Sequence, residues 1–436
     1  MIEVVSYPTQ PQAPKLSAIL GRHAGVPADI EESVRGILQA VCDRGDAAVV
    51  DFTAQFDGVS LSPDRLRVAP SDLQQAYDKM APDLLEAITA AAANIRSFHE
   101  RQRQNSWFVE DGDGVILGKR QTPLRRVGIC VPGGNAPLLS SLLMTAVPAQ
   151  VAGVGEVCVV SPPGPNGLPY PDILAAAHLL GLEEVYGIGG AQAVGAMAFG
   201  TESVPAVDKI VGPGGPYTVA AKKQVYGVVG IEMIPGPSEI VVLADAEADP
   251  RFVAADLLSQ AEHGSGLEAS VCITPCAKLA EAVRSEVERQ VPELPLAESI
   301  RRALENFGAI IVVPDLSIGI KLVNEMAPEH LELLVRDPWS RLEEIENAGA
   351  IFLGPASAEA VGDYFAGTNH VLPTNGAARY ASSLGLEDFV KTTSIVAYTP
   401  ERLRKVGKQI IRLAEAEGLQ AHAQSIRVRL KESGDS

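Results

Sequence analysis

Apolar residues recur along the first quarter of the chain at the spacing of helices. In residues 28–58 and 71–102 they return every three or four positions, so each segment has one apolar face. From residue 126 onward, short apolar runs alternate with helical segments that begin at Pro137, Pro171, Ala191 and Pro216. This alternation is typical of a parallel sheet. The pattern therefore predicts an α/β unit after a helical opening region.

A second alternating series indicates a second sheet. Its apolar runs, SEIVVLAD, ASVCITP, AIIVVPD, HLELLV and GAIFLG, are separated by helical segments. The tail from Leu386 differs, because one strand-like run, TSIVAYT, leads into one charged amphipathic helix. We therefore expect two tandem α/β units and a C-terminal arm, of a kind that often packs on a partner subunit.

Composition and charge narrow the class of protein. At 436 residues the chain can bury a large core without metal or disulfide cross-links, so any bound metal is expected to be functional. A formal net charge of −18 argues against nucleic acid and anionic membranes as partners. There is no apolar run of roughly 18 residues, as a membrane span needs, and the start MIEVVSYPTQ lacks signal-peptide features. We expect a cytoplasmic enzyme.

The five cysteines predict neither disulfides nor a zinc-thiolate site. They are odd in number, show no CxxC spacing and mostly lie in apolar runs such as EVCVVS. Buried free thiols are the expected state.

Glycine-rich turns follow several of the expected strands. VPGG at 131–134, GIGGAQA at 187–193 and GPGGPY at 212–217 each open onto a helix. Such turns bring backbone amides close to a ligand and suit the phosphates of a dinucleotide. None reads GxGxxG, so tight turns needed only for packing account for them equally well.

The segment LLSQAEHGSG presents Gln260 and His263 three residues apart, on one face of a helix. Zinc takes imidazole and carboxylate ligands, so His263, Asp363 and His422 could form a site, with an amide oxygen from Gln260. The alternative is a polar helix end that stops at Gly264.

Glu329 and His330 form a second candidate centre. A carboxylate and an imidazole at the start of one strand can share general-base work near neutral pH. The alternative is a solvated turn.

Segments along the whole chain together resemble the histidinol dehydrogenase family. In order, they are IRSFHERQ, VPGGNAPL, GGAQAVGAMAFGT, KIVGPGG, GPSEIVVLAD, DLLSQAEHG, MAPEHLEL, AGAIFLG, GDYFAGTNHVLPT and EGLQAH. The resemblance implies a homodimeric enzyme with one zinc per subunit. Such an enzyme oxidises L-histidinol to L-histidine in two NAD-dependent steps, with L-histidinaldehyde held on the enzyme between them.

The resemblance also implies roles for individual residues. The zinc ligands fall on Gln260, His263, Asp363 and, from the neighbouring subunit, His422. The catalytic bases fall on Glu329 and His330. The substrate contacts comprise the four zinc ligands, His330, Ser238, His370 and Glu417. The cofactor contacts fall on Pro132, Gln192 and Gly215.

Two positions depart from the family pattern, and both concern the NAD site. CVPGG places Cys130 where tyrosine is usual, and GPGG places Gly215 where the family reads GPGN. Both changes remove side-chain contacts from the expected NAD site.

Three functions are alternatives to the oxidation of L-histidinol. They are a zinc- and NAD-dependent dehydrogenase of another small amino alcohol or diol, a zinc hydrolase in which Glu329 activates water, and a non-catalytic scaffold.

The expected architecture follows from the pattern and the resemblance together. We expect two Rossmann-like, aldehyde-dehydrogenase-like domains, an N-terminal arm and a C-terminal arm exchanged in the dimer. The expected boundaries are an arm over 1–25, a first α/β domain over 26–127 plus 240–385 with most metal and catalytic residues, a second α/β domain over 128–239 with the turns for NAD, and a dimerisation arm over 386–436.

Overall fold

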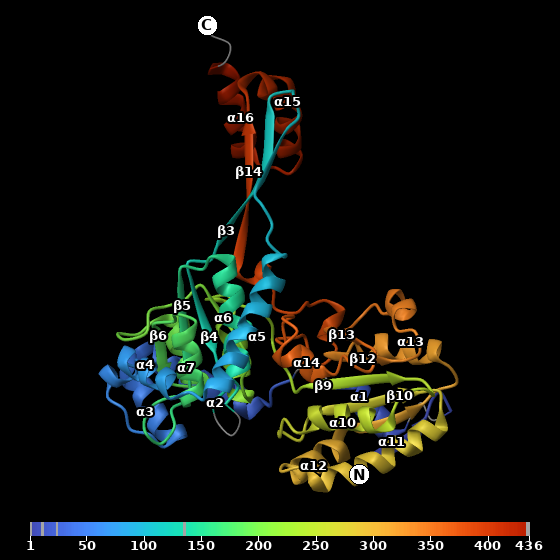
Figure 1. The fold of residues 1–436 in the computed structure, drawn as a ribbon. Coiled ribbons are helices and arrows are strands. Elements are labelled where there is room, and N and C mark those ends of the chain that lie inside the picture. The colour runs from blue at the N-terminus through green and yellow to red at the C-terminus, as the bar shows by residue number, and fades with distance from the viewer. Residues whose placement is uncertain (1, 10–12, 23–24, 134–136, 433–436) are drawn as a thin grey trace. The chain divides into compact units, whose positions relative to one another are not determined.

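The computed structural model describes residues 2–9, 13–22, 25–133 and 137–432. The chain divides into two compact units (Figure 1). The first unit comprises residues 1–102 and 124–389, and the second comprises residues 103–123 and 390–436.

A six-stranded parallel sheet carries one half of the first unit. Its spatial order is β1 (Glu3–Ser6), β11 (Gly308–Val312), β10 (Ala269–Thr274), β9 (Glu239–Ala244), β12 (His330–Leu334) and β13 (Ala350–Leu353). Every residue of β9 and β10 is buried, because helices cover both faces of the sheet. The predicted apolar runs therefore form central strands.

The helices between these strands supply the two covering layers. On one face, α10 (Pro250–Ala261), α11 (Ala277–Gln290) and α12 (Ala297–Phe307) pack against Ile240 and Val242 (Figure 1). On the other face, α1 (Pro14–Leu20) and α13 (Leu316–Met326) pack against Val241 and Leu243. The period of two along β9 thus divides its side chains between two cores.

A five-stranded parallel sheet carries the other half of the first unit. Its order is β6 (Glu184–Gly187), β5 (Glu156–Ser161), β4 (Arg126–Cys130), β7 (Lys209–Val211) and β8 (Gly230–Ile231). The helices that follow its strands are α6 (Leu139–Ala152), α7 (Pro171–Leu179), α8 (Gly190–Phe199) and α9 (Pro216–Val225). The two parallel sheets confirm the predicted α/β class.

The helices of the opening region pack on the five-stranded half. They are α2 (Ala28–Arg44), α3 (Asp46–Asp57), α4 (Pro70–Lys79) and α5 (Pro82–Glu100). α2 lies against α8 and α9, α4 against α7, and α5 against α6 (Figure 1). The structure differs here from the expected boundary, which groups residues 26–127 with 240–385. An amphipathic helix buries its apolar face against whichever sheet offers a matching surface. The faces of α4 and α5 meet the core around Val127 and Ile129, and those of α2 and α3 meet the core around Cys158 and Ile210.

The second unit is an antiparallel ribbon with a helix pair. β2 (Trp107–Glu110) and β14 (Val390–Tyr398) flank β3 (Val115–Pro123). α15 (Pro400–Ala416) and α16 (Gln420–Glu432) pack on each other. The sequence predicts one helix in this tail, but the chain turns at Gly418, whose φ of 75° suits glycine. Residues 103–123 belong to this unit as well, which the expected arm over 386–436 does not include.

The cysteines are free thiols, as expected, but Cys42 is exposed and Cys276 is only half-buried. All five are unpaired, and Cys130, Cys158 and Cys272 are buried. No helix in the described part of the chain combines the length and the apolar composition that a membrane span needs.

Candidate active site

The candidate catalytic residues lie where two neighbouring strands begin. Glu329 directly precedes β12, His330 is its first residue, and β12 pairs with β9, whose first residue is Glu239. Backbone N–H groups at the start of a strand have fewer ladder partners and can bind carboxylates. The N–H of Glu239 donates to Glu329 Oε2 over 3.0 Å, and the N–H of Glu329 donates to Glu239 Oε1 over 3.3 Å. These two hydrogen bonds hold both carboxylates at the amino ends of β9 and β12.

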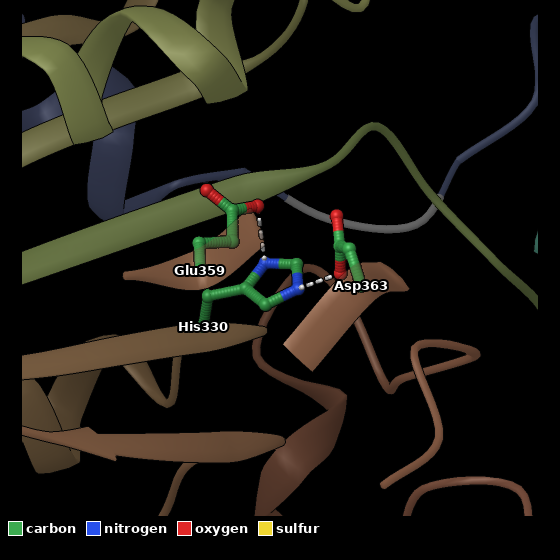
Figure 2. A group of neighbouring side chains, drawn as sticks. All are labelled: His330, Glu359 and Asp363. Atoms are coloured by element: carbon green, nitrogen blue, oxygen red, sulfur yellow. Dashed lines mark ion pairs between the residues drawn. The ribbon is translucent and has the colours of Figure 1, made fainter. Parts of the chain in front are cut away.

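The two ring nitrogens of His330 have different surroundings. Nδ1 lies 3.1 Å from the backbone oxygen of Glu239, to which it can only donate. Nε2 has no hydrogen-bond partner among the described residues and lies 3.7 Å from Asp363 Oδ1 (Figure 2). Because the carbonyl keeps the Nδ1 proton in place, Nε2 is the nitrogen that can accept a proton.

Acidic groups surround His330 in a buried setting. Nδ1 lies 3.3 Å from Glu359 Oε1 and 3.8 Å from Glu329 Oε2. Burial alone would lower the pKa of His330, but the negative charges of Glu329 and Glu359 outweigh it and raise that pKa. Burial also raises the pKa of Glu329 above the usual range of a carboxyl group. A carboxyl group with a raised pKa suits a base that works near neutral pH.

Gln260 and His263 come together at the C-terminal end of α10, as their spacing predicts. The amide nitrogen of Gln260 lies 3.4 Å from His263 Nδ1, and this Nδ1 lies 3.1 Å from the backbone oxygen of Gln260. Gln260 is fully buried, and its Oε1 has no hydrogen-bond partner among the described residues. A buried oxygen without a partner is costly unless a ligand meets it.

Asp363 lies in α14 (Glu359–Tyr364) and is surrounded by imidazoles. Burial alone would raise its pKa, but His330, His370 and His263 lower it. His370 Nδ1 lies 3.1 Å from the backbone oxygen of Asp363, and burial lowers the pKa of His370. Three histidines and one carboxylate thus share a single electrostatic neighbourhood.

Ser238 is half-buried just before β9, and its backbone oxygen accepts from the N–H of Ala269 over 3.1 Å. Glu417 and His422 are exposed in the second unit, between α15 and α16 and near the start of α16. The roles expected for these three residues remain predictions.

The glycine-rich turns meet at the carboxyl ends of β4, β6 and β7. A cavity of about 180 Å³ lies there, and its lining includes Cys130, Pro132, Gly189 and Gly215. Gln192 is buried in the first turn of α8, next to this lining. Ligands of open parallel sheets bind at such carboxyl ends. Gly134, the last residue of the VPGG turn, lies outside the described residues.

A buried ion pair holds the GPGG turn in place. Lys222 Nζ donates to the backbone oxygen of Gly212 over 2.9 Å and to Glu232 Oε1 over 2.6 Å. Glu232 Oε1 also accepts from the N–H of Gly212 over 2.8 Å. Gly212 has a φ of 105°, and a Cβ there would lie 2.3 Å from the backbone oxygen of Cys130. Only glycine fits at this position, so the turn is a fixed shape.

A family model described as Histidinol dehydrogenase matches residues 21–430. The chain belongs to the histidinol dehydrogenase family. It is similar to "Histidinol dehydrogenase" of Synechococcus sp., with 49% identity over 430 residues, 98% of this chain and 99% of the relative. It is also similar to "Histidinol dehydrogenase" of Halalkalibacterium halodurans, with 49% identity over 417 residues, which cover 95% of this chain and 98% of the relative.

A solved structure supports the same family at the level of fold. Histidinol dehydrogenase from Elizabethkingia anophelis matches with a TM-score of 0.92 and 36% identity, and the match covers 99% of this chain and 98% of that chain. As a member of the histidinol dehydrogenase family, the chain is an oxidoreductase.

Both departures from the family pattern lie in the cavity of the glycine-rich turns. Burial raises the pKa of the Cys130 thiol to about 12, so this side chain stays uncharged at neutral pH. A Cβ at Gly215 would have no atom within 4 Å, so the turn faces open space there.

Glu359 belongs to the candidate site although no sequence motif singles it out. Ligand atoms of His330, Glu359 and Asp363 all lie within 4.8 Å of one another (Figure 2). Ser259 Oγ donates to Glu359 Oε2 over 3.1 Å. The spacing of Glu359 and Asp363 is the signal that could have found it, because residues four apart share one face of a helix. This group overlaps the expected ligand set only at Asp363, so that set remains a prediction.

Proposed function

We propose that this enzyme oxidises L-histidinol to L-histidine in two NAD-dependent steps, with L-histidinaldehyde bound between them. The observation that best supports the proposal is the pair of bases at the start of β12. The carbonyl of Glu239 leaves Nε2 as the nitrogen through which His330 would exchange a proton, and Glu329 lies beside it with a raised pKa. Two successive oxidations at one carbon each need a proton acceptor.

The donor groups beside this pair fit a zinc ion. Gln260 offers a buried oxygen without a partner among the described residues, and Asp363 offers a carboxylate. His263 engages Nδ1 with a backbone oxygen, which leaves Nε2 as the nitrogen that can bind a metal. Bound zinc would anchor the amine and imidazole nitrogens of histidinol and, by offsetting the charge of Asp363, would let His330 lose its proton more readily.

The cavity of the glycine-rich turns fits NAD. α8 and α9 begin at these turns, so their first N–H groups are available for phosphate oxygens. Pro132 and Gly215 line the cavity and Gln192 lies beside it, as proposed cofactor contacts. Bound NAD would accept one hydride in each oxidation.

The residues of the chain account for the proton transfers. In the first oxidation, Nε2 of His330 takes the hydroxyl proton of histidinol as a hydride leaves the carbinol carbon. In the second, Glu329 takes a proton from water, whose oxygen attacks the aldehyde carbon. The resulting hydrate anion loses a second hydride, and the carboxylic acid that forms releases its remaining proton to solvent and becomes the carboxylate. Ser238 and His370 are proposed to hold the substrate in the pose that both steps need.

The test is the yield of NADH from a panel of amino alcohols. The absorbance of NADH should rise with L-histidinol by two equivalents for each histidinol consumed. Other small amino alcohols and diols should react far more slowly, because they lack the imidazole nitrogen. A faster reaction with another alcohol would favour the alternative substrate within this family, and hydrolysis of an ester without NADH would overturn the proposal.

We propose further that the enzyme is a homodimer in which Glu417 and His422 complete the site of the partner subunit. The second unit leaves large apolar side chains exposed, including Trp107, Phe108, Val396 and Leu413. Apolar side chains that gather on a small unit are typical of an interaction surface. Because Glu417 and His422 lie on this same unit, dimerisation could bring them to a neighbour.

Mixing two inactive variants should restore activity if sites are shared. His263→Ala removes a ligand of the first unit, and His422→Ala removes one of the second unit. After random subunit exchange, about half of the dimers are hybrids, and each hybrid holds one intact site, so about a quarter of the wild-type activity should return. NADH formation measures the recovery.

The matched control mixes His263→Ala with Asp363→Asn. Both changes lie in the first unit, so every hybrid site keeps one lesion and no activity should return. Equal recovery in the two mixtures, or none in a verified hybrid of His263→Ala and His422→Ala, would argue for sites built from one chain.

A further inference from the structure

We infer that Glu239, held by Arg22, is a positioning residue that fixes both Glu329 and His330. The inference rests on the proposed roles of those two residues. Glu239 touches each of them through a different atom, while its own carboxylate accepts hydrogen bonds from Arg22 and from backbone N–H groups.

The backbone of Glu239 holds the two proposed bases through two of its atoms. Its N–H donates to Glu329 Oε2 over 3.0 Å, and its carbonyl oxygen accepts the Nδ1 proton of His330 over 3.1 Å. One residue therefore sets the orientation of the Glu329 carboxylate and the tautomer of the His330 ring. A small displacement of Glu239 would move both groups at once.

The two oxygens of the Glu239 carboxylate have separate partners. Oε1 accepts from the N–H of Glu329 over 3.3 Å and from the N–H of Asn375 over 2.9 Å. Oε2 accepts from Arg22 Nη1 over 2.8 Å. The carboxylate thus joins β12, the loop at Asn375 and the segment after α1 to the start of β9.

Arg22 makes the buried charge of Glu239 tolerable. The side chains of Arg22 and Glu239 are only 8% and 10% exposed. Arg22 also donates to the backbone oxygen of Leu267 over 2.8 Å and lies 5.1 Å from the ring centre of Phe307. Separating the partners of a buried ion pair leaves each charge uncompensated, so Arg22 and Glu239 are expected to stay in contact.

Glu239→Gln tests the inference because it changes one oxygen and keeps the shape. If the oxygen of the new amide faces the N–H of Glu329, the NH2 group of the amide faces Arg22 Nη1, and these two donors repel each other. With the amide reversed, it turns that donor toward the N–H groups of Glu329 and Asn375 instead. We expect kcat to fall roughly 10- to 100-fold, as small misplacements of catalytic groups do, while KM changes less than about threefold.

Arg22→Gln in the same chain should restore the lost function. Two facing amides can form a hydrogen bond, so the double variant should recover most of kcat. Hydrogen–deuterium exchange gives a readout that needs no substrate. The N–H of Glu329 should exchange faster in Glu239→Gln than in the wild type, and more slowly again in the double variant.

Glu184→Gln is a matched control in the other sheet. Arg126, whose side chain is 3% exposed, pairs with Glu184 and with Glu156 at the amino ends of β4, β5 and β6. This control should lower thermal stability while leaving kcat and the exchange of the Glu329 N–H unchanged.

The inference is overturned if Glu239→Gln leaves the exchange of the Glu329 N–H unchanged. It is also overturned if kcat stays at the wild-type value, or if kcat is lost without recovery in the double variant. A wild type that makes no NADH from histidinol would instead contradict the proposed function, and the exchange measurement would still decide the positioning role.

Discussion

Glu329→Gln should leave the first oxidation of histidinol largely intact and slow the second by about two to four orders of magnitude, the usual cost of losing a general base. In the proposed mechanism, only the second step needs water to be deprotonated. The substitution keeps the size of the side chain, and its amide oxygen can still accept from the N–H of Glu239, as Glu329 Oε2 does. The change therefore removes the base with little change in geometry.

The measurement is the time course of NADH at high enzyme concentration. The variant should give a burst near one equivalent per site, followed by slow turnover. His330→Asn should slow the first step and therefore give no burst; if His330 assists both steps, it should slow the second as well. Histidinaldehyde isolates the second step, and Glu329→Gln should fail on it as it fails on histidinol. Near-normal oxidation of the aldehyde would move the water-activating role to His330.

Removing the proposed zinc ion should reduce turnover to background, and added zinc should restore it. The reason is the donor set around Asp363, in which Gln260 Oε1 is buried without a partner among the described residues. The fold should survive, because the cores of both sheets are built from apolar side chains and do not depend on a metal.

The measurement combines a chelator, elemental analysis and thermal unfolding. The chelated protein should unfold cooperatively and regain activity with zinc. His263→Ala serves as the comparison, since it should bind zinc more weakly and regain less activity at the same zinc concentration. Full turnover by a preparation shown to be free of metal would contradict the assignment.

The sequence predicts the two sheets well because their strands are buried on both faces. EIVVLA, which forms β9, is apolar at every position after Glu239, and a continuous apolar run of this length is typical of a central parallel strand. A strand without a buried face can lack such a run. β2 is exposed along its whole length, and only the structure reveals its pairing with β3.

The pairing of distant segments is harder to predict than the segments themselves. The apolar faces of α2 and α5 indicate helices, but no periodicity tells which sheet they cover. For the same reason, the spacing of Gln260 and His263 is informative, whereas the sequence gives no sign that Glu359 approaches His330. A local spacing fixes a helix face, and a contact across the sheet depends on the whole fold.

The ribosome synthesises the two paired strands β3 and β14 of the second unit far apart in time. β3 pairs with β14 along its full length, from Val115 with Tyr398 to Pro123 with Val390. At roughly 5–20 residues per second, a ribosome needs on the order of 15 to 50 s for the roughly 270 residues between these strands. The nascent chain therefore carries an open strand edge through most of its synthesis, and open edges invite pairing with other chains. We expect chains cut short before β14 to aggregate unless a chaperone covers that edge.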